Sequence, residues 1–558
     1  MLRRTPRRLP PQSHKASNAA ITTAIGGISA MQQTHRHCVL ACLVFLLTAP
    51  AALAQLSSSK VTGGQLQGTS ADGVASFKGI PFAAPPVGEL RWKAPQPVPA
   101  WQGVRKADAY GPSCMQSAQM IALMGAGPAV SEDCLYLNVW TAAKSAAERR
   151  PVMVWIYGGG FAAGMTGIPG YDGQQFAKRG VVLVSVAYRV GPFGFLADPA
   201  LTREGGGTSG NYGLQDMIAG LRWVKRNIAK FGGDPARVTI FGESAGGLAV
   251  SMLAASPAAA GLFQRAISES GSSFGPPSHS KDAGALVPSL KSAEASGHSF
   301  LTKLGATDLA GARALSADKV QSALPADALS GGFWPNFDGR ILPGDQYLRY
   351  SAGRFNDTPV LIGTNSDEGA LFARPGMTVA AFEMQVRAGY GDHADDILKA
   401  YPHANDLDAA RAAKQLFRDT TFAWGTWAWA KLQSEHGKHP VYIYYFDHRT
   451  PQSPDGANHA SEIAFVFNTL SAPGLGGVRL KIGPKEVKLA EQMQRYWVNF
   501  ATNGDPNGSG LPSWPAFDVK TQQAMVLDDA TGARPLPNQP QLHALDEYFS
   551  WRRENAAK

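Results

Sequence analysis

Cysteine is scarce in this chain, with four among 558 residues. There is no C-x-x-C pair and no His/Cys cluster that suggests a metal, so we expect neither a metal centre nor another bound cofactor. The sequence also lacks internal repeats and long low-complexity tracts, which argues against a repeat array.

Over most of the chain, neither positive nor negative charge is in excess. The formal net charge is +9, but residues 1–54 contain six basic residues and no acidic one. The remaining 46 basic residues nearly balance the 43 acidic residues. Such a near-neutral body lacks the basic surface that nucleic-acid binding needs, so no nucleic-acid partner is expected.

Residues 1–54 are typical of a targeting segment rather than of a folded domain. Cys38–Ala52 is an apolar run interrupted only by Thr48 and Pro50, and it leads into Ala52-Leu53-Ala54, an A-x-A-like cleavage signal. The run is short for a bilayer span, which favours a cleaved signal peptide over a membrane anchor. We therefore expect an N-terminal extension and signal peptide over residues 1–54, with Met31 as a possible true start. The mature chain would be secreted or periplasmic, without a stable membrane span.

Export would leave two cysteines, because Cys38 and Cys42 would depart with the signal peptide. In an oxidising compartment the remaining pair, Cys114 and Cys134, predicts a disulfide. Closing that loop would stabilise the fold by roughly 3 kcal/mol on a loop-entropy basis. The alternative is two separate buried thiols.

What the chain does contain is a series of apolar strand-like runs that alternate with helix-like segments. Strands this apolar on both faces predict a mostly parallel sheet covered by helices, within one domain with insertions over residues 55–558. Leu214–Phe231 has helical spacing and ends at Gly232-Gly233, a plausible helix stop. The predicted strands are Val152–Tyr157, Val181–Tyr188, Val238–Phe241, Val360–Ile362 and Val441–Phe446, and short surface loops are expected at Gly205–Gly210, Gly271–His279 and Pro451–Gly456.

The most informative segment is Val238–Gly247, VTIFGESAGG. A β-branched run meets G-x-S-x-G, and small residues able to start a helix follow, which is the order that a nucleophile elbow requires. We expect positions 242 and 246 to require glycine, because a side chain at Gly242 or Gly246 would collide with the neighbouring strand or helix. Ser244 would stand clear of the sheet at a helix N-terminus and act as a nucleophile.

A nucleophilic serine also needs donors for the developing oxyanion, a base, and a group that orients the base. The first predicted strand runs into Tyr157-Gly158-Gly159-Gly160-Phe161, which resembles an oxyanion motif. The amides of Gly159 and Gly160, with that of Ala245, would then form a three-donor hole. A flexible turn is the alternative, whereas a phosphate loop is disfavoured because no Gly-Lys-Ser/Thr follows.

The remaining two groups are ambiguous on spacing alone. Thr364–Gly369, TNSDEG, follows a predicted strand and offers two carboxylates, Asp367 and Glu368. The strand Val441–Phe446 is followed by two histidines, His448 and His459. Either member of each pair fits the order Ser, acid, His along the chain.

Several sequence blocks carry a family resemblance, and they run across nearly the whole mature chain. They are Phe77–Ala83 (FKGIPFA), Leu90–Trp92 (LRW), Ser131–Asn138 (SEDCLYLN), Gly210–Asp216 (GNYGLQD), Asn227–Ile228, Phe231–Pro235 (FGGDP), the elbow, and Tyr496–Asn507 (YWVNFATNGDPN). On these blocks the chain resembles the type-B carboxylesterase family, which includes cholinesterases and bacterial para-nitrobenzyl esterases. The resemblance implies an α/β-hydrolase fold with a mostly parallel central sheet, flanking helices and insertions.

The resemblance also implies roles for individual residues. It makes Ser244 the nucleophile, His459 the general base and Glu368 the acid of a serine carboxylesterase acting on small-molecule esters. His459 is preferred to His448 because His459–Ile463, HASEI, is similar to the family's histidine block. Further matches are structural: an Arg91–Glu132 salt bridge, a first disulfide Cys114–Cys134, and Glu243, Ser270 and Glu462 near the triad.

Two departures from the cholinesterases bear on substrate. The chain has no aromatic residue between Cys114 and Cys134, where those enzymes carry a choline-binding tryptophan. Near Phe333–Pro335, Leu329 and Gly331 resemble positions of acyl-pocket phenylalanines, which predicts a roomier acyl pocket. The alternative to an esterase is a non-catalytic binding or adhesion protein on the same fold.

Overall fold

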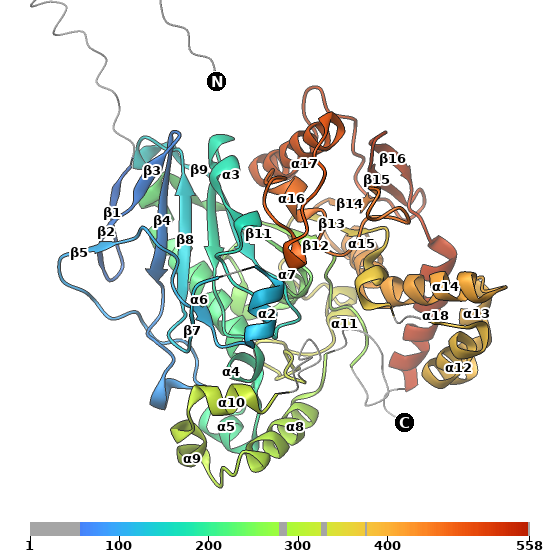
Figure 1. Cartoon of the computed structure of the whole chain (residues 1–558), viewed down its shortest axis with the longest axis horizontal. Coiled ribbons are helices and arrows are strands. Elements are labelled where there is room, and N and C mark those ends of the chain that lie inside the picture. The colour runs from blue at the N-terminus through green and yellow to red at the C-terminus, as the bar shows by residue number, and fades with distance from the viewer. Residues whose placement is uncertain (1–55, 126, 278–286, 325–331, 374–375, 556–558) are drawn as a thin grey trace, which may run out of the picture. The chain divides into compact units, whose positions relative to one another are not determined.

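An eleven-stranded sheet forms the centre of the computed structural model, which describes residues 56–555 except 126, 278–286, 325–331 and 374–375 (Figure 1). The six pairings from β10 through β9 to β15 are parallel, whereas the pairings at both ends of the sheet are antiparallel. The strand order is β16 (Gly532–Pro535), β15 (Gln523–Leu527), β14 (Val441–Phe446), β13 (Val360–Asn365), β12 (Arg265–Glu269), β11 (Gly233–Glu243), β9 (Arg150–Ile156), β10 (Val182–Val186), β8 (Tyr136–Thr141), β4 (Val74–Pro81) and β3 (Thr69–Ala71).

The five strands predicted from apolar runs are all present as members of this sheet, with ends that differ by a few residues. The predicted helix Leu214–Phe231 is also present, as α6 (Tyr212–Asn227) continued by a 3-10 turn, and it ends at Gly232 with φ of 78°. Two small sheets lie apart from the large one: β1 (Ser58–Val61) with β2 (Gly64–Gln67) and β5 (Val104–Lys106), and β6 (Ser113–Cys114) with β7 (Val130–Ser131).

Helices cover both faces of the large sheet. On one face, Phe241 packs against Phe176 of α3, and Glu269 accepts a hydrogen bond from Trp497 of α17. On the other, Ser268 faces Gly247 of α7. The helices are α2 (Ala118–Leu123), α3 (Gln174–Lys178), α4 (Gly191–Phe195), α5 (Pro199–Glu204), α6, α7 (Ala245–Ala255), α8 (Leu290–Lys303), α9 (Leu309–Ala314), α10 (Ala317–Ser322), α11 (Gln346–Ser351), α12 (Val379–Tyr390), α13 (Ala394–Ala400), α14 (Asp406–Arg418), α15 (Trp424–His436), α16 (Ile463–Val466), α17 (Pro484–Asn503) and α18 (Gln539–Asn555).

Parallel strands bring the predicted site residues to one edge of the sheet. The carboxyl ends of β9, β11, β13 and β14 lie side by side, because these strands are parallel members of the same sheet. The glycine run follows β9, Ser244 follows β11, Glu368 follows β13 and His459 comes after β14. Sites in α/β sheets characteristically form at this edge.

One loop prediction is wrong. Gly271–Phe274, the first part of the expected surface loop Gly271–His279, is buried. The reason is close packing behind the elbow: a Cβ on Gly271 would lie 2.3 Å from the carbonyl oxygen of Ser244. In the expected loop Gly205–Gly210, residues 205–208 are exposed or half-buried as predicted, but Ser209 and Gly210 are buried; most of Pro451–Gly456 is exposed or half-buried, as expected.

The chain divides into two compact units, Met1–Ala54 and Gln55–Lys558. The predicted signal peptide, with Met31 and the cleavage signal, lies outside the described residues. Among the helices that are described, none has the length and apolar character needed to cross a membrane.

Candidate active site

The elbow forces Ser244 into a strained backbone conformation. Its φ and ψ are 55° and −123°, in a region that residues with a side chain rarely adopt. A Cβ on Gly242 would lie 2.5 Å from the carbonyl oxygen of Ile156 on β9, and one on Gly246 only 2.0 Å from the same oxygen. The steric prediction for both glycines is confirmed. The turn therefore closes tightly and lifts the Ser244 side chain off the sheet.

Three of the predicted residues come together at this edge. His459 Nε2 lies 2.9 Å from Ser244 Oγ, and His459 Nδ1 lies 2.5 Å from Glu368 Oε2. Because an ionised carboxylate only accepts hydrogen bonds, Nδ1 is the ring nitrogen that carries the proton. In the neutral imidazole, Nε2 is then free to accept the proton of the Ser244 hydroxyl.

The two alternatives lie in other surroundings. Asp367 pairs with Lys414 at 3.2 Å. His448 is buried against Glu486, with Nε2 3.3 Å from Glu486 Oε1. The structure thus brings Glu368 and His459, rather than Asp367 and His448, to Ser244.

Glu368 is fixed by donors from two other segments. Its Oε1 accepts hydrogen bonds from Ser270 Oγ at 2.5 Å and from the amide of Asn365 at 2.7 Å. The Asn365 side chain donates in turn to Glu462 Oε2 at 2.5 Å and to the Asn458 carbonyl at 2.9 Å. Sequence reasoning missed Asn365. Its position at the carboxyl end of β13, three residues before Glu368, is the one signal that pointed to it.

A second carboxylate reaches the histidine. Glu243 Oε1 lies 3.2 Å from His459 Nε2, and both side chains are buried. Burial by itself lowers the pKa of His459, but the charges of Glu243 and Glu368 oppose it and raise that pKa to about 9. Burial has the opposite effect on a carboxyl group, and it raises the pKa of Glu243 to about 7. The imidazolium is therefore a well-stabilised species in this site.

The glycine run lies directly against Ser244. A Cβ on Gly158 would lie 2.9 Å from Ser244 Cβ. Gly159 and Gly160 have φ of 108° and 62°, which glycine adopts without strain. In the part of the chain that the structure describes, neither of these two amides donates a hydrogen bond. α7 begins directly after Ser244, at Ala245, so a helix N-terminus also lies beside this serine.

Aromatic rings enclose the histidine, a feature that sequence reasoning did not find. Phe422 stacks on the His459 ring with centroids 4.7 Å apart, and Phe372 meets it edge-on at 5.7 Å. Both come from segments far from His459 in sequence, so no local pattern marked them. By stacking, Phe422 covers one face of the imidazole.

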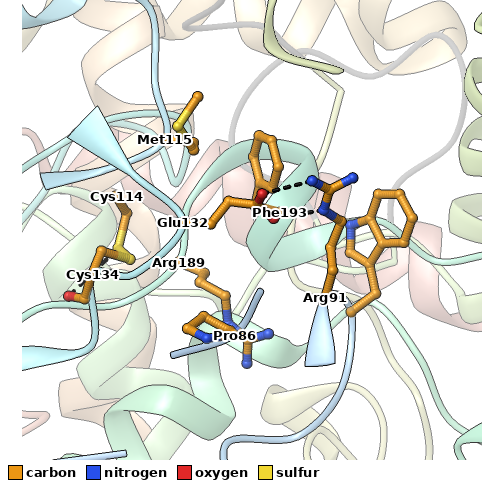
Figure 2. A pocket seen from close by; sticks show the side chains of 9 residues that line it. Pro86, Arg91, Cys114, Met115, Glu132, Cys134, Arg189 and Phe193 are labelled. Atoms are coloured by element: carbon orange, nitrogen blue, oxygen red, sulfur yellow. Dashed lines mark hydrogen bonds and ion pairs between the residues drawn. A yellow bond between two sulfur atoms is a disulfide. The ribbon is translucent and has the colours of Figure 1, made fainter. Parts of the chain in front are cut away.

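The disulfide Cys114–Cys134 is present, with its Cα atoms 5.0 Å apart. The Arg91–Glu132 pair next to it has two contacts of 2.6 Å. Figure 2 shows both features around a small cavity that Met115 also lines. The matches to the family's disulfide and salt bridge are therefore confirmed as contacts.

Across the described residues, no group of three or more His, Cys, Asp and Glu side chains could hold a metal ion. Leu329 and Gly331, the predicted acyl-pocket positions, lie outside the described residues.

Comparison with known proteins identifies the class that this fold and site represent. The model of the carboxylesterase family matches residues 51–544. The fumonisin B1 esterase of Sphingopyxis macrogoltabida is 38% identical over 471 residues, covering 82% of this chain and 83% of the relative. The para-nitrobenzyl esterase of Bacillus subtilis (strain 168) is 37% identical over 489 residues, covering 83% of this chain and 93% of the relative.

Solved structures agree. A PNB esterase superposes with a TM-score of 0.77 at 34% identity, covering 88% of this chain and 99% of the other. A carboxylesterase of Geobacillus stearothermophilus gives a TM-score of 0.76, also at 34% identity, with the same coverage. The fold is therefore the α/β-hydrolase fold. The chain belongs to the carboxylesterase family and is a carboxylesterase, an enzyme of ester hydrolysis.

Proposed function

We propose that the chain is a secreted serine carboxylic ester hydrolase that works through an acyl-enzyme on Ser244. The observation that carries this proposal is the hydrogen-bonded line from Ser244 Oγ to His459 Nε2, 2.9 Å, and from His459 Nδ1 to Glu368 Oε2, 2.5 Å. This order of nucleophile, base and orienting acid suits acyl transfer.

In the proposed mechanism, Ser244 Oγ attacks the ester carbonyl carbon while His459 Nε2 takes the hydroxyl proton. The tetrahedral intermediate collapses, the bond to the alkoxy oxygen breaks, and His459 returns the proton to the leaving alcohol. Water then attacks the acyl-enzyme with the same proton transfers, which releases the acid and restores Ser244. Glu368 holds the imidazole tautomer and stabilises the imidazolium in both halves of the cycle.

The oxyanion of each tetrahedral intermediate would be bound by the amides of Gly159, Gly160 and Ala245. Support comes from the packing of Gly158 against Ser244 and from the unengaged amides of Gly159 and Gly160. A donor of this kind typically contributes about 2.7–4 kcal/mol to transition-state stabilisation.

We expect small-molecule carboxylic esters with acyl groups larger than acetyl to be substrates. The absence of an aromatic residue between Cys114 and Cys134 removes the ring that would attract a quaternary ammonium group. That absence argues against choline-type esters, whereas the roomier acyl pocket predicted from Leu329 and Gly331 is the reason to expect acyl groups larger than acetyl. Hydrolysis confined to acetyl esters would contradict it.

Secretion is the proposed destination, with residues 1–54 as an N-terminal extension and signal peptide and residues 55–558 as one catalytic domain. The apolar run with its A-x-A-like signal and the Cys114–Cys134 disulfide support this organisation. N-terminal sequencing of the exported protein tests it, with Gln55 as the expected first residue.

The test of the activity is hydrolysis of a series of para-nitrophenyl acyl esters by the purified mature chain, beside Ser244→Ala. We expect activity in the native chain and a loss of at least about 10⁴-fold in the variant, because the proposed carrier of the acyl group is removed. Labelling of Ser244 by an organophosphate would accompany the activity. A folded native chain that neither hydrolyses the series nor becomes labelled would favour the non-catalytic binding protein.

A further inference from the structure

The loop closed by the Cys114–Cys134 disulfide is hydrogen-bonded directly to the segment Gly158–Gly164 beside Ser244, here called the glycine loop. Gln116 is buried, and its Oε1 accepts a hydrogen bond from the amide of Gly164 at 3.0 Å. Its Nε2 donates to the Gly164 carbonyl at 2.8 Å and to the Cys114 carbonyl at 3.0 Å. One side-chain amide thus holds both polar backbone groups of Gly164.

Gly164 is the closing residue of the glycine loop. Its φ is 131°, and a Cβ there would lie 2.3 Å from the Tyr157 ring and 2.6 Å from the Gly158 carbonyl oxygen. Within the loop, the Gly159 carbonyl accepts hydrogen bonds from Ala162 at 3.1 Å and Ala163 at 3.0 Å. The loop is therefore a closed turn next to Gly164, through which a shift of Gly164 would be passed to the peptide groups of Gly159 and Gly160.

The opening end of the glycine loop is fixed separately. Tyr157 and Tyr188 stack with centroids 4.4 Å apart. Tyr188 Oη donates to the Tyr157 carbonyl at 2.8 Å, and Tyr157 Oη donates to the Tyr188 carbonyl at 3.0 Å. Gln116 supplies the matching restraint at the closing end.

Apolar side chains of the disulfide loop reinforce this contact. Met120 and Met124 of the loop form a buried cluster with Ala163 and Met165. A Cβ on Gly159 would lie 2.9 Å from the Met124 methyl group. Methionine side chains adapt to irregular spaces, so this cluster fills the space between the two loops without fixing the orientation of the glycine loop. The directional restraint comes from the three hydrogen bonds of Gln116.

We propose that Gln116 is a positioning residue that sets the orientation of the Gly159 and Gly160 amides toward the developing oxyanion. This inference rests on the proposed oxyanion hole. Gln116 acts through Gly164 and touches neither the ester nor the reacting atoms. Its loss would weaken binding of the transition state while leaving binding of the ground-state ester almost unchanged.

The test compares the full mature chain with Gln116→Met, which keeps the side-chain length and removes all three hydrogen bonds. We expect kcat on a para-nitrophenyl ester to fall roughly 10- to 100-fold, with KM within about two-fold, because small misplacements of catalytic donors have effects of this size. Affinity for a trifluoromethyl ketone that adds to Ser244 should fall by the same factor as kcat/KM.

Ser117→Ala is the matched control. Ser117 is the next residue in the same loop, and its Oγ accepts a hydrogen bond from the Met120 amide at 3.2 Å as the N-cap of α2. We expect this variant to lose stability but to keep kcat and the ketone affinity. A role of Gln116 limited to loop stability would make the two variants alike.

Gln116→Glu carries the same comparison should Gln116→Met fail to fold, because it keeps the acceptor for the Gly164 amide and removes the donors. A folded Gln116 variant with native kcat would overturn the inference, as would a kcat loss without a matching loss of ketone affinity. Activity that survives Ser244→Ala would instead refute the proposed function, so the two failures are distinguishable.

Discussion

The Ser244 side chain has few ways to move, since its backbone and both of its flanks are fixed. Its amide donates to the Glu269 carbonyl at 2.9 Å, and its own carbonyl accepts from Leu248 at 2.8 Å in the first turn of α7. The strained φ persists because these bonds and the close contacts of Gly242 and Gly246 over-determine it. Preorganisation of this kind holds Oγ at hydrogen-bonding distance from His459 before substrate arrives.

The choice between two adjacent carboxylates yields a prediction at the same scale. Glu368→Gln should lower kcat by roughly 10³- to 10⁴-fold, because an amide beside Nδ1 no longer fixes the tautomer or stabilises the imidazolium. Asp367→Asn is the control, since Asp367 pairs with Lys414 instead. Steady-state kinetics on one para-nitrophenyl ester measures both. An equal loss in the two variants would refute the assignment of the acid.

The second carboxylate at His459 predicts a pH effect. In the proposed mechanism activity requires neutral His459, so kcat/KM should fall as the pH drops through the pKa of His459, which Glu243 and Glu368 raise to about 9. Glu243→Gln removes one of these charges and should lower that pKa, so the acid limb of the profile moves to lower pH. Asp455→Asn, an exposed carboxylate change, should leave the limb in place. An acid limb that stays fixed in Glu243→Gln would show that Glu243 does not set the charge of His459.

At the scale of elements, the strand–turn–helix unit from β11 to α7 depends on space that only glycine leaves. Gly246→Ala would place a methyl group 2.0 Å from the Ile156 carbonyl oxygen, in backbone that cannot yield without moving β9. We expect loss of soluble folded protein or a destabilisation of at least about 2 kcal/mol. Gly389→Ala is the matched control, because a Cβ on Gly389 in α12 meets nothing within 4 Å. Thermal unfolding of both variants checks the contrast, and equal melting temperatures would contradict it.

Local pattern predicted the elements because each predicted strand is a mostly apolar run, interrupted at most by a single polar residue, Ser185 or Thr239, and is followed by glycine or a polar residue. It could not choose Glu368 over Asp367, since the two are adjacent and their surroundings come from Ser270 and Lys414, far away in the chain. The same limit applies to Asn365 and Gln116, whose partners become neighbours only when the loops fold together. Family blocks supplied the choice of acid and base that spacing left open.

On the scale of the whole molecule, buried carboxyl groups behind the triad face one another across the sheet edge. Glu243 and Glu269 are paired in register on β11 and β12, and Glu462 is buried with them. Burial raises the pKa of all three, to about 7 for Glu243, to about 8 for Glu269 and well above its ordinary value for Glu462. Their shared charge is therefore a cost of folding that grows with pH.

The variant Glu269→Gln tests whether the buried Glu269 carboxyl group makes the folded protein less stable as the pH rises. Between about pH 5 and pH 8 folded Glu269 keeps a proton that the unfolded chain releases, so its contribution to stability falls as the pH rises toward its folded pKa of about 8. Glutamine has no such loss and still offers an acceptor to Trp497 Nε1, 2.8 Å away in the native chain. The melting temperature of the variant relative to the native chain should therefore rise by roughly 2 °C or more from about pH 5 to about pH 9. Glu491→Gln, a change at an exposed position of the same helix as Trp497, should show a difference that does not vary with pH. A pH-independent difference for Glu269→Gln would mean that Glu269 is charged in the folded protein and that its charge is compensated there.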